Sequence, residues 1–164
     1  TGASEGTIDT LPALVNMNVS KAFLYGFDFG FQYNFYSGFV LSGTGAYVRA
    51  RDTEAGADLP QIPPLNGRLG IRYTSNKIGS VELTLAGAAG QDKIAEGEKE
   101  TDGYTRLDLA LNSASITLRN TRLQLFAGIE NLTDRSYTNH LSTNRGSISV
   151  EPGRNVYVRM TLGF

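Results

Sequence analysis

The sequence predicts an all-β protein, an antiparallel meander of about seven strands, and three observations carry this prediction. Apolar residues recur at every second position, most clearly between Phe23 and Phe35, where every odd-numbered residue is Phe or Tyr. No long window shows the i, i+3, i+4, i+7 apolar stripe of an amphipathic helix. The connections between the alternating segments are short and long in turn, which is typical of successive antiparallel hairpins.

The strands follow one another in the order set by these alternating segments. We expect them at residues 23–35, 39–47, 67–73, 81–89, 105–112, 122–130 and 155–164, with residues 14–22 extending the first strand upstream. The short connections are then residues 36–38, 74–80 and 113–121, and the long ones are residues 48–66, 90–104 and 131–154. This spacing places all the short turns at one end of the sheet.

The two faces of the predicted sheet differ sharply in charge. The odd positions of the first six strands and the even positions of the last strand carry no charged residue, although Gly43 and Gly45 leave the facing of strand 39–47 ambiguous. The opposite face carries all the charges of these spans: Asp28, Arg68, Arg72, Glu82, Arg106, Asp108, Arg122, Glu130 and Arg159.

Such a pattern fits either a soluble β-sandwich, with its apolar face inside, or an outer-membrane barrel, with its apolar face toward lipid. Seven large aromatic residues on one strand would overfill a small sandwich core, whereas they suit a lipid face and its interfaces. Thirteen residues also span about 43 Å, enough to cross the ~25 Å apolar band even when tilted. The short-turn and long-loop ends match the two sides of such a barrel, and a charge at mid-bilayer costs about 2–4 kcal/mol. The membrane interpretation is therefore favoured.

Composition excludes several classes of function. The net charge of −1 gives no basic face for nucleic acid, and the absence of cysteine excludes disulfides and cysteine-ligated metal sites. No apolar run is long enough for a transmembrane helix. With one histidine and no Ser/His/Asp or Cys/His arrangement, we expect neither an enzyme nor a bound cofactor.

The C-terminal sequence carries a more specific signal. The stretch "LQLFAGIENLTDRSYTNHLS" is followed by "EPGRNVYVRMTLGF", which ends on Phe164. This resembles the C-terminal end of TonB-dependent outer-membrane receptors, in which a strand runs into an Asn-Leu-x-Asp-(Lys/Arg)-x-Tyr element, here Asn131 to Tyr137. A long external loop follows there, then a Pro-Gly-Arg that opens the last strand, here Pro152 to Arg154. Thr133 departs from the aromatic residue usual in the family, and upstream "VSKAFLYGFDF" and "LPQIPPLNGRLGIRY" resemble the family more loosely.

The resemblance implies that residues 1–164 form the C-terminal segment of a 22-stranded outer-membrane β-barrel, without the plug domain and the earlier strands. An odd strand count also leads us to expect that the rest of the barrel and the plug come from elsewhere. The implied function is TonB-dependent active uptake of a scarce nutrient, an iron–siderophore, haem or other metal complex, across the bacterial outer membrane. The implied partners are the TonB energy-coupling complex, outer-membrane lipid or lipopolysaccharide, and the small-molecule cargo. A passive barrel or porin and a soluble β-sandwich binding module are the alternatives.

Candidate contact residues follow from the charged face and the last loop. His140 is either a ligand for metal, haem or substrate at the external mouth or a loop-packing histidine, and a lone histidine is poor evidence for metal. The lumen charges either guide an anionic ligand or pair with one another. Phe164 resembles the terminal assembly signal of outer-membrane proteins, while Asn131 and Asp134 are expected to close a local turn at a strand end. The substrate-contact candidates are thus His140, Arg68, Arg72, Arg106, Asp108 and Arg159.

Overall fold

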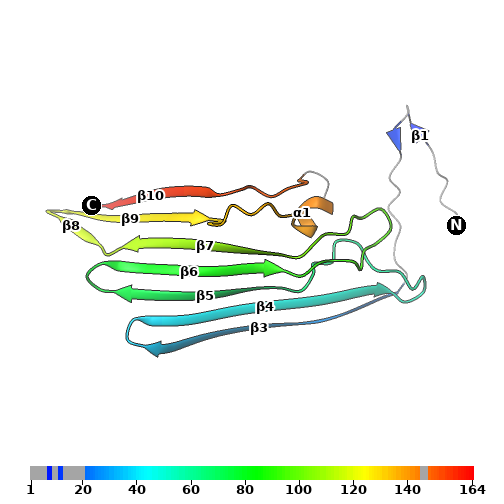
Figure 1. Cartoon of the computed structure of the whole chain (residues 1–164), viewed down its shortest axis with the longest axis horizontal. Coiled ribbons are helices and arrows are strands. Elements are labelled where there is room, and N and C mark those ends of the chain that lie inside the picture. The colour runs from blue at the N-terminus through cyan, green and yellow to red at the C-terminus, as the bar shows by residue number, and fades with distance from the viewer. Residues whose placement is uncertain (1–6, 9–10, 13–20, 145–147) are drawn as a thin grey trace.

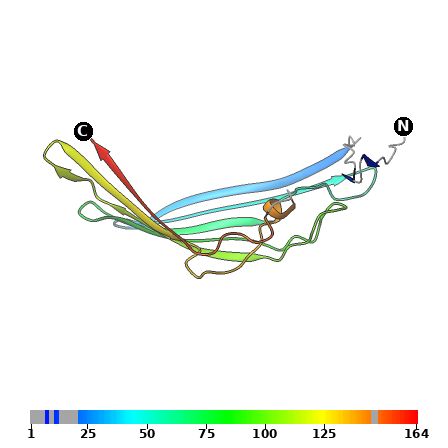
Figure 2. The same ribbon diagram turned by 90° about the horizontal axis from the view of Figure 1, so that it is seen from above.

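A single curved antiparallel sheet dominates the computed structural model, which describes residues 7–8, 11–12, 21–144 and 148–164 (Figures 1 and 2). Strands follow chain order across the sheet from β3 at one edge to β10 at the other, except that β7 pairs with β9 and the short β8 also pairs with β9. The described chain thus forms the meander that the sequence predicts; residues 14–20 of the expected upstream extension lie outside the described part. The strands of the sheet are β3 (Ala22–Tyr36), β4 (Phe39–Asp52), β5 (Asn66–Ser75), β6 (Gly79–Ala88), β7 (Tyr104–Ser113), β8 (Ile116–Leu118), β9 (Thr121–Glu130) and β10 (Asn155–Gly163), with a separate pair, β1 (Thr7–Ile8) and β2 (Leu11–Pro12).

The connections are unequal, as expected from the sequence. Figure 1 shows the short turns at one end of the sheet and the long loops at the other. The two largest differences from the prediction concern β4 and the connection after β7. Strand β4 runs on to Asp52, and the connection expected at residues 113–121 contains β8, leaving a tight turn at Arg119 and Asn120. The last long loop holds the one short helix of the described residues, α1 (His140–Asn144).

The register fixes which residues share a face. Phe29 lies opposite Gly45, and between β9 and β10 Ile129 lies opposite Val156, so the apolar face passes from odd to even positions at the last strand. Because side chains alternate across a strand, all nine charges of the predicted charged face lie on the same side of the sheet. The facing of β4, ambiguous in the sequence, is settled by this register.

Gly43 and Gly45 lie on the apolar face beneath two aromatic rings of β3. Phe31 is the register partner of Gly43 and Phe29 that of Gly45. A Cβ added at either glycine would overlap the facing ring. The small residues that obscured the facing of β4 therefore make room for the large rings of β3.

A one-residue bulge separates β7 from β8. Asn112 pairs with Phe126 and Ile116 with Leu123, so three residues of one strand face two of the other. Ser113 fills the irregularity, because its Oγ accepts a hydrogen bond from the Leu125 N–H at 2.9 Å. Beyond the bulge, Ile116 lies on the apolar face although its number is even.

The sheet has no apolar core of the kind that a sandwich needs. Ala50 is the buried hydrophobic residue of the described chain, and the accessible surface is 12089 Å². A compact monomer of this length would expose about 8,000 Å². Val158, on the apolar face of β10, is 75% exposed. A single sheet with one bare apolar face and one charged face disagrees with the soluble sandwich and agrees with the wall of a membrane barrel.

Within the described residues, none of the helical structure reaches the length and apolar character required to cross a membrane.

Candidate functional site

A pocket of about 440 Å³ lies on the charged face, at the loop end of the sheet. Strands β5, β6 and β7 supply its floor, and the last long loop folds back to cover it. Figure 2 shows α1 of that loop on the concave side of the sheet. The concave, charged face is the lumen side of a barrel wall, since the apolar face must meet lipid. The polar side chains that line the pocket are Asn66, Arg68, Tyr104, Arg106, Tyr137, Asn139, Ser142 and Glu151.

Two tyrosines form the aromatic wall of the pocket. The rings of Tyr104, at the start of β7, and Tyr137, in the last loop, stack with centroids 4.3 Å apart. Their hydroxyl groups are held by hydrogen bonds, since Asn139 Nδ2 donates to Tyr104 Oη at 3.3 Å and Arg106 Nη1 donates to Tyr137 Oη at 3.2 Å. The stack therefore fixes the loop to the sheet and leaves a flat, partly polar surface facing the pocket.

Arg106 is positioned by a carboxylate on its own strand. Its Nε and Nη2 donate to Asp108 Oδ2 at 3.2 and 2.9 Å. The second oxygen of Asp108 accepts the main-chain N–H of Asn131 at 2.9 Å. Asp108 thus links the arginine to the end of β9, and Arg106 is oriented before any ligand arrives.

The Asn131 to Tyr137 element is a compact turn at the end of β9. Asn131 is 1% exposed; its Oδ1 accepts the Arg135 N–H at 3.0 Å and its Nδ2 donates to the Arg135 carbonyl at 2.8 Å. Asp134 Oδ1 accepts the Arg154 N–H at 2.7 Å. Asn131 and Asp134 both have positive φ, which short polar side chains tolerate better than most. The local turn expected from the sequence forms as described, and it directs Tyr137 toward the pocket.

Glu151 and Arg68 are the pocket's two charged groups without an assigned partner. Glu151 Oε1 is buried and has no hydrogen-bond partner among the described residues. The Glu151 N–H donates to the Tyr137 carbonyl at 2.9 Å, which holds this residue against the aromatic wall. Arg68 is exposed on β5, and its guanidinium forms no hydrogen bond or ion pair within the described part of the chain. The exposed Arg68 guanidinium is therefore available to a bound polar molecule.

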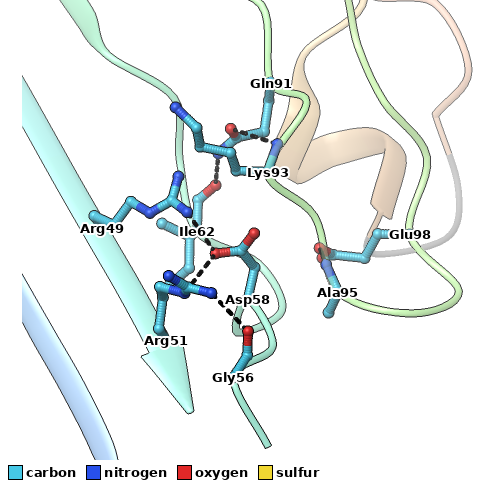
Figure 3. A network of polar contacts seen from close by, with 9 residues as sticks. All are labelled: Arg49, Arg51, Gly56, Asp58, Ile62, Gln91, Lys93, Ala95 and Glu98. Atoms are coloured by element: carbon cyan, nitrogen blue, oxygen red, sulfur yellow. Dashed lines mark hydrogen bonds and ion pairs between the residues drawn. The ribbon is translucent and has the colours of Figure 1, made fainter. Parts of the chain in front are cut away.

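Ion pairs and hydrogen bonds connect the loops beside the pocket to one another and to β4. Figure 3 shows Asp58 between two arginines, at 2.9 Å from Arg49 and 3.9 Å from Arg51. In the same view Gln91 Nε2 donates to the Ile62 carbonyl at 2.8 Å, which joins loop 89–103 to loop 53–65. Glu98 Oε2 accepts the Ala95 N–H at 3.0 Å and closes a turn within loop 89–103.

His140 belongs to the link between loop 89–103 and the last loop. The imidazole is 3% exposed, and its Nδ1 lies 3.1 Å from both Thr101 Oγ1 and Asn144 Nδ2. Asn144 also bonds both main-chain groups of Lys99, accepting its N–H at 2.7 Å and donating to its carbonyl at 3.1 Å. His140 Nε2, on the other side of the ring, is buried without a hydrogen-bond partner among the described residues.

Besides His140, two more of the predicted contact residues, Arg72 and Arg159, lie apart from this pocket. Arg72 on β5 forms an ion pair with its register partner Glu82 at 2.7 Å. Arg159 on β10 stacks over the Phe126 ring at 4.3 Å. Together they line a second hollow of about 400 Å³, lower on the charged face. The structure therefore brings Arg68 and Arg106 together, places Asp108 behind Arg106, and separates Arg72, Arg159 and His140 from them.

Metal binding finds no support in the side-chain arrangement of the described residues, since no three of the His, Asp and Glu side chains there gather closely enough to hold an ion. Phe164 is 98% exposed at the short-turn end. Sequence reasoning missed Tyr104, Asn139 and Glu151 as pocket residues. The sequence signal for Tyr137 was its place in the Asn-Leu-x-Asp element; the others depend on how the last loop folds back.

Comparison with known proteins identifies the class. The family model "TonB dependent receptor-like, beta-barrel" matches residues 2–132. The chain belongs to the TonB-dependent receptor β-barrel family, whose members are receptors and transporters rather than enzymes and reside in the bacterial outer membrane. Among solved structures, the chain is similar to one titled "Copper transporter OprC", with 26% identity and a TM-score of 0.74. The match covers 85% of this chain but 23% of the transporter, and no match appears among curated proteins.

Proposed function

We propose that this chain is the C-terminal part of an outer-membrane receptor that imports a scarce nutrient by TonB-dependent active transport. Residues 1–164 would supply barrel wall and three external loops. The complete transporter would also require a plug domain, the remaining strands of the barrel and the energy-coupling complex. Family membership and the bare apolar face support this proposal.

The observation that carries the proposal is the polar pocket on the lumen side beneath the last loop. It opens where ligand would arrive from outside, because long loops are external in such barrels. Tyr104 and Tyr137 offer a stacking surface, and Asn139 an amide. We propose that the segment contributes this pocket to the receptor's ligand-binding surface.

The pocket chemistry favours a metal chelate over a bare cation. Two guanidinium groups, Arg68 and Arg106, and one carboxylate, Glu151, line it. Guanidinium groups suit the carboxylate or other oxygen acceptors of a chelator, whereas a naked metal ion requires several protein donors. The similarity to a copper transporter makes a copper complex one candidate cargo, beside ferric siderophores and haem. In this proposal His140, Arg72 and Arg159 have structural roles.

The test uses the complete receptor that carries this segment. Binding of ferric citrate, haem and copper(II) sulfate would be measured separately, and metal-limited growth would be followed in cells whose own receptor gene is deleted. Arg68→Gln should weaken binding of the recognised probe by about tenfold or more, because a hydrogen bond to a charged group contributes about 1.5–3 kcal/mol. Arg72→Gln, on the same strand but outside the pocket, is the matched control.

Wild-type binding of all three probes by both variants would contradict the assignment of the pocket. Growth that does not depend on the energy-coupling protein would contradict active transport.

A further inference from the structure

The apolar face carries a groove at the opposite, short-turn end of the sheet. Its volume is about 410 Å³, and apolar atoms dominate its lining. Its floor lies over residues with little or no side chain on this face: Gly79 of β6, Ser113 of β7 and Ala127 of β9. Larger side chains rise around it, among them Tyr73, Val81, Leu125 and Val158.

The bulge after β7 explains why the groove exists. Gly79 is the register partner of Ser113, so two small residues lie side by side on β6 and β7, and Ala127 of β9 lies opposite Leu111, two residues before Ser113. The Ser113 hydroxyl is directed to the backbone, donating to the Ala114 carbonyl and accepting from Leu125, each at 2.9 Å. The side chain that would otherwise fill the centre of the groove is thereby held against the strand.

Position on the membrane face limits what can occupy the groove. Beside the groove, the ring of Phe39 on β4 lies 4.7 Å from the ring of Tyr73 on β5. Phe35 and Tyr36 extend this aromatic cluster at the short-turn end of the sheet. Aromatic girdles mark the interfaces of outer-membrane barrels, and short turns lie on the periplasmic side. The groove therefore opens at the periplasm-facing interface, where acyl chains meet lipid head groups.

The turns beside the groove are basic. Residues 37–38, 76–78 and 119–120 form the three short turns, and their charged side chains are Lys77 and Arg119. Neither forms an ion pair with a described residue. Figure 1 shows the tips of the successive hairpins displaced stepwise along the strand direction. Because the strands of a barrel are tilted, tips staggered in this way lie at a common depth in the membrane. An apolar groove bordered by the Lys77 turn, with Arg119 at the tip of the β8–β9 hairpin beyond it, is complementary to an anionic lipid.

We propose that this groove is a binding site for one anionic diacyl phospholipid of the periplasm-facing leaflet, with an acyl chain in the groove and the phosphate head group near Lys77 and Arg119. The proposal rests on the membrane placement argued above. It adds a lipid site on the outer wall, remote from the cargo pocket.

The experiment is native mass spectrometry of the complete receptor, equilibrated in detergent with equal amounts of phosphatidylglycerol and phosphatidylethanolamine. Wild type should retain one phosphatidylglycerol, at least fivefold more often than phosphatidylethanolamine. Ala127→Phe fills the groove while keeping the face apolar, and should lower that occupancy about fivefold. Leu85→Phe, on the same face outside the groove, should leave it unchanged.

The charge is tested separately, with substitutions in the turns, outside the residues that line the groove. Lys77→Gln combined with Arg119→Gln should abolish the preference for phosphatidylglycerol while retaining some bound lipid. Lys93→Gln combined with Lys99→Gln removes the same charge at the opposite end and should not change the preference. Equal retention of both lipids by wild type, or loss of occupancy in Leu85→Phe as large as in Ala127→Phe, would overturn the proposal.

Insertion is scored in the same samples by the heat-dependent shift of a folded barrel on a denaturing gel. Absence of that shift in wild type would contradict the membrane placement itself. A normal shift without lipid preference would contradict the lipid site alone.

Discussion

The carboxylate of Asp134 accepts a hydrogen bond from the main-chain N–H of Arg154 at 2.7 Å, across a loop of twenty residues. This bond joins the end of β9 to the start of β10, so the long loop leaves and returns at one fixed point. Asp134→Ala should destabilise the folded receptor by about 0.5–1.5 kcal/mol, because an exposed charge-assisted hydrogen bond to the main chain is lost. Asp134→Asn, which keeps an oxygen acceptor, should lose less.

The measurement is the midpoint of urea-induced unfolding in lipid vesicles. Asp102→Ala, in the exposed part of another loop, is the control and should leave the midpoint unchanged. Equal midpoints for Asp134→Ala and the control would show that the bond does not hold the loop.

The pairing of Phe31 with Gly43 predicts a steric effect confined to one face. Gly43→Ala should destabilise the sheet by about 1–3 kcal/mol, since the new Cβ overlaps the ring. Gly30→Ala is the matched control on the neighbouring strand, because the nearest atoms there lie at 3.7 and 3.8 Å. The double variant Gly43→Ala, Phe31→Ala should regain part of the loss. Unfolding in vesicles checks all three, and a Gly30→Ala loss as large as that of Gly43→Ala refutes the explanation.

A positive charge added to one face of β3 should affect assembly differently from the same charge added to the other face. Phe29→Arg places a cation on the lipid side near mid-membrane, at a cost of about 2–4 kcal/mol, and should block assembly. Gln32→Arg places it on the lumen side and should be tolerated. The heat-dependent gel shift of outer-membrane fractions measures assembly, and identical behaviour of the two variants would mean that the assigned facing is wrong.

The Asn144 link predicts a change in protease sensitivity without loss of the barrel. Asn144→Ala removes the bonds to Lys99 and to His140, so loop 89–103 should open more often. Trypsin should then cleave after Lys93 or Lys99 several times faster, while the heat-dependent shift persists. Ser142→Ala, in the same helix, should be cleaved as slowly as wild type; unchanged cleavage of Asn144→Ala would disprove the link.

The fold was largely predictable because facing in a membrane sheet depends on a strict two-residue period. Even the change of parity at the last strand follows from the residues, since Val156 and its successors continue the apolar face. The extension of β4 to Asp52 was not predictable from this period, since the strand there leaves the apolar band and Arg49 and Arg51 pair with a loop carboxylate. The bulge was not predicted either, because residues 113–115 belong to the connection that the sequence predicts as a turn.

The candidate site was less predictable. Arg68 and Arg106 lie on the same face of the sheet, and the two-residue period of the sequence was sufficient to predict this. Their separation from Arg72 could not, because it depends on where the last loop returns to the sheet. Tyr104, Asn139 and Glu151 enter the pocket through contacts between segments far apart in sequence, such as the Tyr104–Tyr137 stack.

Because of the bulge between Ser113 and Ile116, the facing of side chains at the short-turn end of the sheet depends on the number of residues there rather than on their identity. With three residues opposite two, Ile116 and Leu118 face outward. Deleting one residue there, whatever its identity, would rotate both into the aqueous lumen and turn Thr117 toward hydrocarbon. A homologous barrel can therefore exchange these side chains freely, yet it must conserve their number.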